Sequence, residues 1–186
     1  MKQLLFFLCL LCLPCAAQDK RYHGDGIDNL LRFVPITAVV TMKAAGMEGA
    51  SSWKRLATNT VASYAIAAGT TYALKHSIHS RRPDGTDRRS FPSGHSTVVF
   101  AGAHILYKEY GRKHPWIAVA GYGVASATAA DRVRRNRHHW ADVTAGAAIG
   151  IAGTELGYRL GDLITGEKSR YQLSITPNEV ALNISL

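Results

Sequence analysis

The chain lacks cysteine after its first fifteen residues, because its three cysteines are Cys9, Cys12 and Cys15. A disulfide framework or a cysteine-ligated metal site is therefore excluded from the rest of the sequence. Acidic residues are also scarce, with 13 Asp and Glu against 22 Lys and Arg and a net charge of +9. Such a basic chain favours anionic partners.

Long apolar runs are missing after the N-terminus as well. The longest uncharged stretch, Leu56–Leu74, is interrupted by Thr, Ser and Asn side chains, and Pro115–Ala130 is only 16 residues long. A bilayer-spanning helix needs about 20 predominantly apolar residues. We therefore expect a soluble domain, or one attached peripherally to a membrane surface, rather than an integral membrane protein.

Residues 1–17 have the pattern of a secretory signal peptide. Lys2 precedes the apolar run Leu4–Leu13, and the small residues up to Ala17 offer a cleavage site. Acylation of Cys15, as in a lipoprotein, is the alternative use of this segment. We expect an exported protein that is periplasmic, or membrane-associated and facing the periplasm.

The pattern of apolar residues predicts an all-α fold, a helical bundle of about five to six helices with a short C-terminal β-hairpin. The helical domain is expected over residues 18–168, and alternating apolar and polar residues around Pro177 predict the hairpin extension over 169–186. The clearest helices are expected at Gly26–Met42, Ser52–Arg82, Ser96–Tyr110, Pro115–Ala130 and Trp140–Leu163.

The turn Pro92-Ser93-Gly94-His95 comes directly before a predicted helix. The N-terminus of a helix has unpaired N–H groups and the positive end of the helix dipole, and it attracts anions. Ser93 and the Gly94 amide are therefore candidate anion ligands. His95 adds a titratable group, which a structural capping role would also explain.

Basic residues lie on both sides of this turn. Lys75 and Arg82 are seven residues apart, so one continuous helix ending at Pro83 would place both on one face. A guanidinium fork beside an ammonium group suits the several oxygens of a phosphate. Arg132 is expected in a loop that brings a third cation to the same anion. A solvated basic helix end is the alternative interpretation of Lys75 and Arg82.

His138 and Asp142 have an i, i+4 spacing at the start of the last predicted helix. On a helix, the carboxylate lies beside the imidazole, fixes its tautomer and leaves the other ring nitrogen to attack phosphorus. His139 also reaches Asp142, at i, i+3, so the spacing alone leaves the choice of histidine open. The alternative functions of this segment are to bind a metal ion or to bind a nucleic acid. Without an HExxH pattern or interleaved aromatic residues, we expect neither.

Together these residues resemble the signature of the type 2 phosphatidic acid phosphatase superfamily, which includes bacterial class A acid phosphatases and vanadium haloperoxidases. The three parts, Lys-x6-Arg-Pro, Pro-Ser-Gly-His and Ser-Arg-x5-His-x3-Asp, correspond here to Lys75–Pro83, Pro92–His95 and Asp131–Asp142. The resemblance selects His138 over His139. Asp131 departs from the pattern, because it replaces the usual serine and removes a hydroxyl group.

The resemblance implies a phosphatase that needs no metal and no cofactor. The implied phosphate ligands are Lys75, Arg82, Ser93, Gly94 and Arg132. The resemblance also implies that His138 attacks to give a phosphohistidine, that Asp142 orients it, and that His95 protonates the leaving alcohol. The expected partner is a phosphate-ester substrate, including a lipid phosphate or pyrophosphate at a membrane surface, and no nucleic acid.

Two other functions stay open at this point. A vanadate-dependent haloperoxidase would use the same anion pocket, with vanadate held by His138. A non-enzymatic protein that binds anions or a membrane surface would need the histidines only for structure. The motifs contact only the phosphate, so they do not distinguish a lipid from a sugar or a nucleotide.

Overall fold

The structure is a computed structural model that describes residues 26–167, 171–176 and 179–184. Within them the helices are α2 (Asp28–Leu31), α3 (Val34–Ala44), α4 (Trp53–Ser77), α5 (Gly94–Leu106), the π-helical turn η1 (Tyr107–Gly111), α6 (Pro115–Arg134) and α7 (Trp140–Thr165). The predicted helical class is confirmed. None of the described helices combines the length and the apolar character needed to cross a bilayer. The predicted signal peptide lies outside the described residues.

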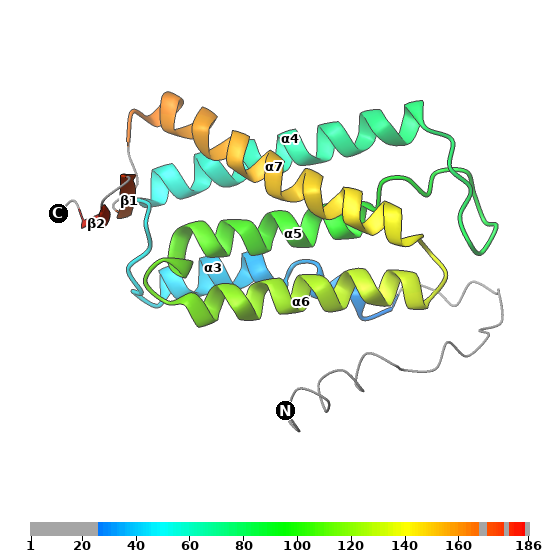
Figure 1. The fold of residues 1–186 in the computed structure, drawn as a ribbon, viewed down its shortest axis with the longest axis horizontal. Helices are drawn as coiled ribbons and strands as arrows, with labels where there is room; N and C mark the ends of the chain where they lie inside the picture. Colours follow the sequence, from blue (N-terminus) through cyan, green and yellow to red (C-terminus); the bar gives the residue numbers. More distant parts are fainter. Residues whose placement is uncertain (1–25, 168–170, 177–178, 185–186) are drawn as a thin grey trace, which may run out of the picture.

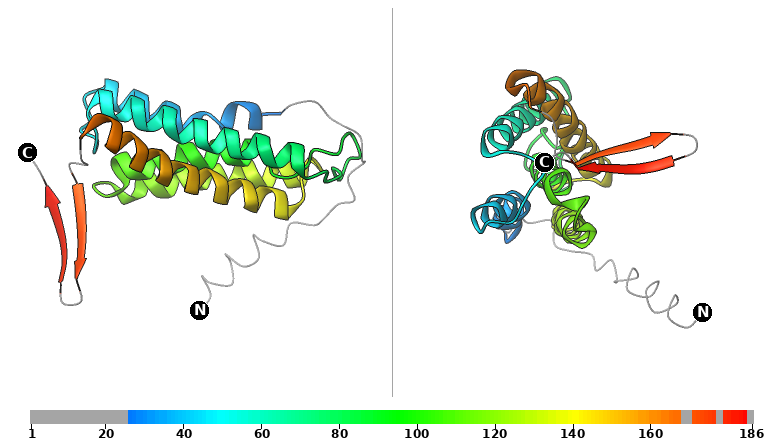
Figure 2. Two further views of the ribbon diagram at one scale, coloured as in Figure 1. Left: turned by 90° about the horizontal axis from the view of Figure 1, so that it is seen from above. Right: turned by 90° about the vertical axis from the view of Figure 1, so that its left-hand side faces the viewer.

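Helix α5 occupies the middle of the bundle (Figure 1). It contacts α4 and α7 on one side and α3 and α6 on the other, an arrangement that the end-on view on the right of Figure 2 also shows. Most of its residues are buried, and Val99, Ala101 and Ile105 are completely so. Its sequence is correspondingly apolar or small at nearly every position, as a helix surrounded by other helices requires.

Glycines along one side of α7 let that helix lie very close to its neighbours. A Cβ atom at Gly150 would lie 2.5 Å from the carbonyl oxygen of Thr97 in α5. One at Gly157 would lie 2.4 Å from the backbone nitrogen of Ser63 in α4. Non-bonded atoms do not approach so closely, so α7 packs backbone to backbone against both helices, which fixes its position in the bundle.

The predicted N-terminal helix over Gly26–Met42 is in fact two helices, α2 and α3. Pro35 lies in the first turn of α3. Because proline has no N–H group and its ring clashes with the preceding turn, it can begin a helix but cannot continue one. The break turns α2 into a separate short element.

The helix predicted over Ser52–Arg82 ends earlier, at Ser77, and Ile78 is extended. Lys75 and Arg82 therefore do not share a helical face, and Pro83 does not end the helix. The prediction for Arg132 was also wrong, because α6 continues to Arg134 and Arg132 lies in its last turn rather than in a loop.

After the helices, β1 (Tyr171–Thr176) and β2 (Glu179–Ile184) pair antiparallel, with Tyr171 opposite Ile184. The division of the chain into a helical domain over 18–168 and an extension over 169–186 stays a prediction.

Candidate active site

The motif residues meet at one end of the bundle, on the right in Figure 1. There α4 and α6 end, α5 and α7 begin, and residues 78–93, here called the site loop, connect α4 to α5. The Ser93 amide donates to the Asp142 carbonyl oxygen at 2.9 Å, and the Asp84 amide donates to the Asn136 carbonyl oxygen at 3.1 Å. These backbone bonds hold the three motif segments together.

His138 lies at the centre of this end and is only 2% exposed. Its Nε2 atom is 3.2 Å from Nη1 of Arg82. A guanidinium can only donate, so Nε2 presents its lone pair and the ring proton is assigned to Nδ1. Burial first, and then the charges of Arg82, Arg132 and Lys75, lower the pKa of His138 to about 2. The structure therefore brings the three predicted cations close to a neutral imidazole.

Asp142 contacts His138 less directly than the spacing predicted. His138 precedes α7 instead of lying in it, and Oδ2 of Asp142 is 3.5 Å from Nδ1, longer than an ordinary hydrogen bond. The same oxygen accepts hydrogen bonds from the His139 amide at 2.9 Å and from the Ser90 hydroxyl. Ser90 also hydrogen-bonds His138 through its backbone. Sequence reasoning missed Ser90, because it lies outside every motif.

Arg82 is held in place by the site loop itself. Its Nε atom is 2.9 Å from each carboxylate oxygen of Asp87, and Nη1 donates to the Arg137 carbonyl oxygen at 2.9 Å. Burial alone would raise the pKa of Asp87, but hydrogen bonds from the Arg89 amide and from Arg82 outweigh it and lower the pKa. An ionised carboxylate thus anchors the guanidinium on the side away from His138.

Lys75 runs beside the first turn of α5. A Cβ atom at Gly94 would lie 3.9 Å from Cε of Lys75, and the ammonium group donates to the Arg89 carbonyl oxygen at 2.9 Å. Burial first, and then the charge of Arg82, lower the pKa of Lys75 to about 8. Ser93 caps α5, since its Oγ accepts from the Ser96 amide at 3.4 Å. This cap explains why α5 begins at Gly94, two residues before the predicted start.

Two residues that sequence reasoning missed contact this part of the site: Asp28 links Arg132 to His95, and Asn29 contacts His95. Asp28 accepts a hydrogen bond from Arg132 and lies 3.8 Å from Nε2 of His95. Oδ1 of Asn29 is 2.7 Å from the same ring nitrogen. No motif marks either residue in the sequence.

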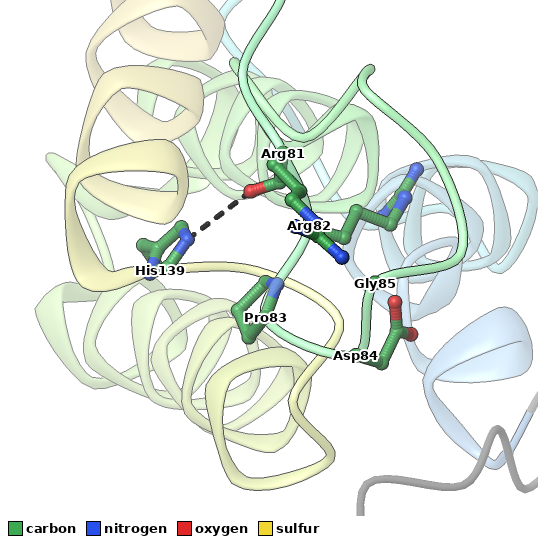
Figure 3. A pocket seen from close by; sticks show the side chains of 6 residues that line it. All are labelled: Arg81, Arg82, Pro83, Asp84, Gly85 and His139. Atoms are coloured by element: carbon green, nitrogen blue, oxygen red, sulfur yellow. Dashed lines mark hydrogen bonds between the residues drawn. The ribbon is translucent and has the colours of Figure 1, made fainter.

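His139, the neighbour of His138 in the chain, occupies a different place. A pocket of about 420 Å³ opens beside the site loop, lined by Arg81, Arg82, Pro83, Asp84, Gly85 and His139 (Figure 3). There Nε2 of His139 is 3.3 Å from the Arg81 carbonyl oxygen. The exposed ring of His139 thus lies at the pocket wall, whereas the ring of His138 is buried near the cations.

Comparison with known proteins gives two matches to this chain. The model of the PAP2 superfamily matches residues 56–163. The Lipid A 1-phosphatase of Porphyromonas gingivalis is 39% identical over 168 residues, which cover 87% of this chain and 38% of that protein. The chain therefore spans less than half the length of this curated relative. No solved structure matches the chain significantly.

Proposed function

Because the chain belongs to the type 2 phosphatidic acid phosphatase (PAP2) superfamily, we propose that it removes phosphate from a lipid phosphate through a covalent intermediate on His138. The family assignment confirms the resemblance that the three motifs indicated, and the name of the relative supports a phosphatase acting on phosphate esters. The proposal depends on one observation above all. The Nε2 lone pair of a buried, neutral His138 lies 3.2 Å from Arg82, and the charges of Lys75 and Arg132 also act on the ring.

In the first step the phosphate enters between the cations and His138. Lys75, Arg82 and Arg132 neutralise its oxygens, and Ser93 and the Gly94 amide add hydrogen bonds.

Nε2 of His138 then forms a bond to phosphorus while the bond to the leaving oxygen breaks. His95 gives a proton to that oxygen, so the leaving group departs as an alcohol. The ring becomes positively charged, a change that Asp142 stabilises across 3.5 Å.

In the second step water attacks the phosphohistidine. His95, now neutral, takes a proton from the water as the nitrogen–phosphorus bond breaks, and inorganic phosphate is released. The cations stabilise the charge on the transferring oxygens in both steps. The residues and their roles are proposals that the geometry supports.

A lipid phosphate is the proposed substrate because the relative is named for an activity on lipid A. We further propose that the chain is exported with residues 1–17 as its signal peptide. N-terminal sequencing of the protein from a periplasmic extract tests this, and a mature chain that still begins at Met1 would contradict it.

The test of function is phosphate release from lipid A, phosphatidate, undecaprenyl pyrophosphate and soluble monoesters. We expect release from at least one lipid, and a loss of at least about 10³-fold in His138→Ala. His139→Ala is the matched control and should retain most of the activity. Release from soluble esters alone would contradict the lipid substrate. Halide oxidation with added vanadate, without phosphate release, would contradict the phosphatase.

A further inference from the structure

Two site residues come from a segment outside the region that the family model matches. Asp28 and Asn29 belong to α2, whereas the match covers residues 56–163. Asp28 is completely buried, although it carries a charge and lies in a four-residue helix. A buried carboxylate is costly unless it is well paired with hydrogen-bond donors or positive charges.

Asp28 binds cations at both of its oxygens. Oδ2 accepts from Nη1 of Arg132, and Oδ1 lies 2.8 Å from Nη1 of Arg135 and 3.0 Å from the Gly26 amide. Burial alone would raise the pKa of Asp28, but the hydrogen bond and charge of Arg132, with the charges of His95 and Arg135, lower it. Asp28 is therefore an ionised carboxylate that holds Arg132.

Arg132 keeps hydrogen-bonding capacity despite this partner. Its Nε–H group is buried and has no hydrogen-bond partner in the part of the chain that the structure describes. A buried donor without a partner is costly, and an incoming acceptor would satisfy it. Asp28 thus anchors the guanidinium through one nitrogen, while another donor is left for a phosphate oxygen.

Asn29 fixes the second group, the ring of His95. Its Oδ1 atom lies 2.7 Å from Nε2, so this ring nitrogen carries a proton and donates it to the amide oxygen. Nη1 of Arg32 approaches the same nitrogen at a longer distance of 3.3 Å. Oδ2 of Asp28 lies 3.8 Å from the same nitrogen.

We propose that Asp28 and Asn29 are positioning residues of the phosphatase reaction, in which Asp28 holds Arg132 on the phosphate and both residues hold His95 at the leaving oxygen. This inference rests on the proposed function. The segment before the matched region would then orient the proton donor, His95, in addition to attaching α2 to the bundle.

The role at His95 and the role at Arg132 can be distinguished with two substrates that differ in their leaving group. An alkoxide needs a proton as it departs, whereas a nitrophenolate does not. A misplaced proton donor therefore slows the formation of the phosphohistidine, which kcat/KM reports, only for the first. Hydrolysis of the phosphohistidine is common to both esters, so it enters kcat but not kcat/KM. A misplaced Arg132 weakens phosphate binding and slows both. The substrates are phosphatidate and a 4-nitrophenyl phosphate that carries a long alkyl chain.

Asn29→Ala should lower kcat/KM for phosphatidate by about 10–100-fold and change kcat/KM for the nitrophenyl ester by less than about threefold. Asp28→Asn should lower kcat/KM for both esters, more for phosphatidate, and raise the inhibition constant of inorganic phosphate by about tenfold. Asp131→Asn is the matched control. Its carboxylate lies at the end of α6 next to Arg132 in the chain, but it pairs with Arg134 at 2.7 Å and, at a longer distance of 3.9 Å, with Arg135, so both esters should react as in the wild type.

Equal losses on the two esters in Asn29→Ala would overturn the role at His95. An Asp28→Asn protein with wild-type kinetics and only a lower melting temperature would overturn the role at Arg132. If Asp28→Asn does not fold, the ratio of the two esters in Asn29→Ala still decides the inference. A wild-type protein that releases no phosphate from either ester would instead contradict the proposed function.

Discussion

Both ends of the bundle bury charged side chains of both signs, but the surroundings of the central group differ in sign. At the end where α5 finishes, Glu109 is 1% exposed and accepts hydrogen bonds from the Ser51 amide at 3.0 Å and the Tyr158 hydroxyl at 2.7 Å. At the other end, His138 is surrounded by the charges of Arg82, Arg132 and Lys75. At the first end, hydrogen-bond donors surround the buried carboxylate of Glu109. At the second end, cations surround the buried imidazole of His138.

The pKa shifts of the two ends follow these signs. Burial, and then the charge of Glu109, raise the pKa of Tyr158, so the phenol keeps its proton and continues to donate. The pKa of His138 is lowered to about 2, so the ring stays unprotonated. At the Glu109 end the protein's own donors satisfy the charge, which serves stability. At the His138 end positive potential remains, as the proposed binding of a phosphate requires.

Removing an arginine from each end should therefore have opposite consequences. We expect Arg82→Ala to lower kcat/KM by about 10²–10³-fold, because it removes a cation beside the proposed nucleophile, His138. The melting temperature should change little. Arg55 is the matched residue at the other end, where its Nε and Nη2 atoms pair with Asp162 at 2.8 and 3.0 Å.

Arg55→Ala should lower the melting temperature and leave kcat per folded molecule unchanged. Steady-state kinetics and thermal unfolding of both variants make the comparison. Loss of turnover in a fully folded Arg55→Ala protein would contradict the division between the two ends.

Glu109→Gln should reduce the free energy of unfolding by about 1–3 kcal/mol. The amide nitrogen that replaces one oxygen would face a donor, since Ser51 donates to both carboxylate oxygens through its amide and its hydroxyl. Urea unfolding measures the change, and kcat at a temperature where the variant is folded should stay at the wild-type value. An unchanged unfolding midpoint would show that the network around Glu109 contributes nothing to stability.

Raising the pH should weaken anion binding at the site end. Since the pKa of Lys75 is lowered to about 8, its positive charge is lost as the pH rises through about 8. The dissociation constant of sulfate, whose own charge is constant between about pH 6 and 10, should then increase by up to about tenfold per pH unit. Lys75→Arg keeps its charge over this range and should remove the transition. Calorimetric titrations that give the same pH dependence for both proteins would contradict this role of Lys75.

The helical class, the three motif segments and the main helices could be predicted from the sequence, because hydrophobic periodicity and motif spacing are local signals. The end of α4 at Ser77 could not be predicted, because the site loop is held by distant partners such as the Asn136 carbonyl oxygen. Ser90 and Asp28 were missed for the same reason. Each acts through a group more than 40 residues away in the chain, as the pairs Ser90–Asp142 and Asp28–Arg132 illustrate.

The central claim is that His138 forms the bond to phosphorus, and trapping that bond tests it most directly. Wild-type protein is mixed with a radiolabelled lipid phosphate and quenched in alkali during turnover, because phosphohistidine is stable in base and labile in acid. We expect acid-labile label on His138, found by mass spectrometry, that persists in His139→Ala and is absent from His138→Ala. Label on another residue, or undiminished phosphate release by His138→Ala, would show that His138 does not form the bond to phosphorus.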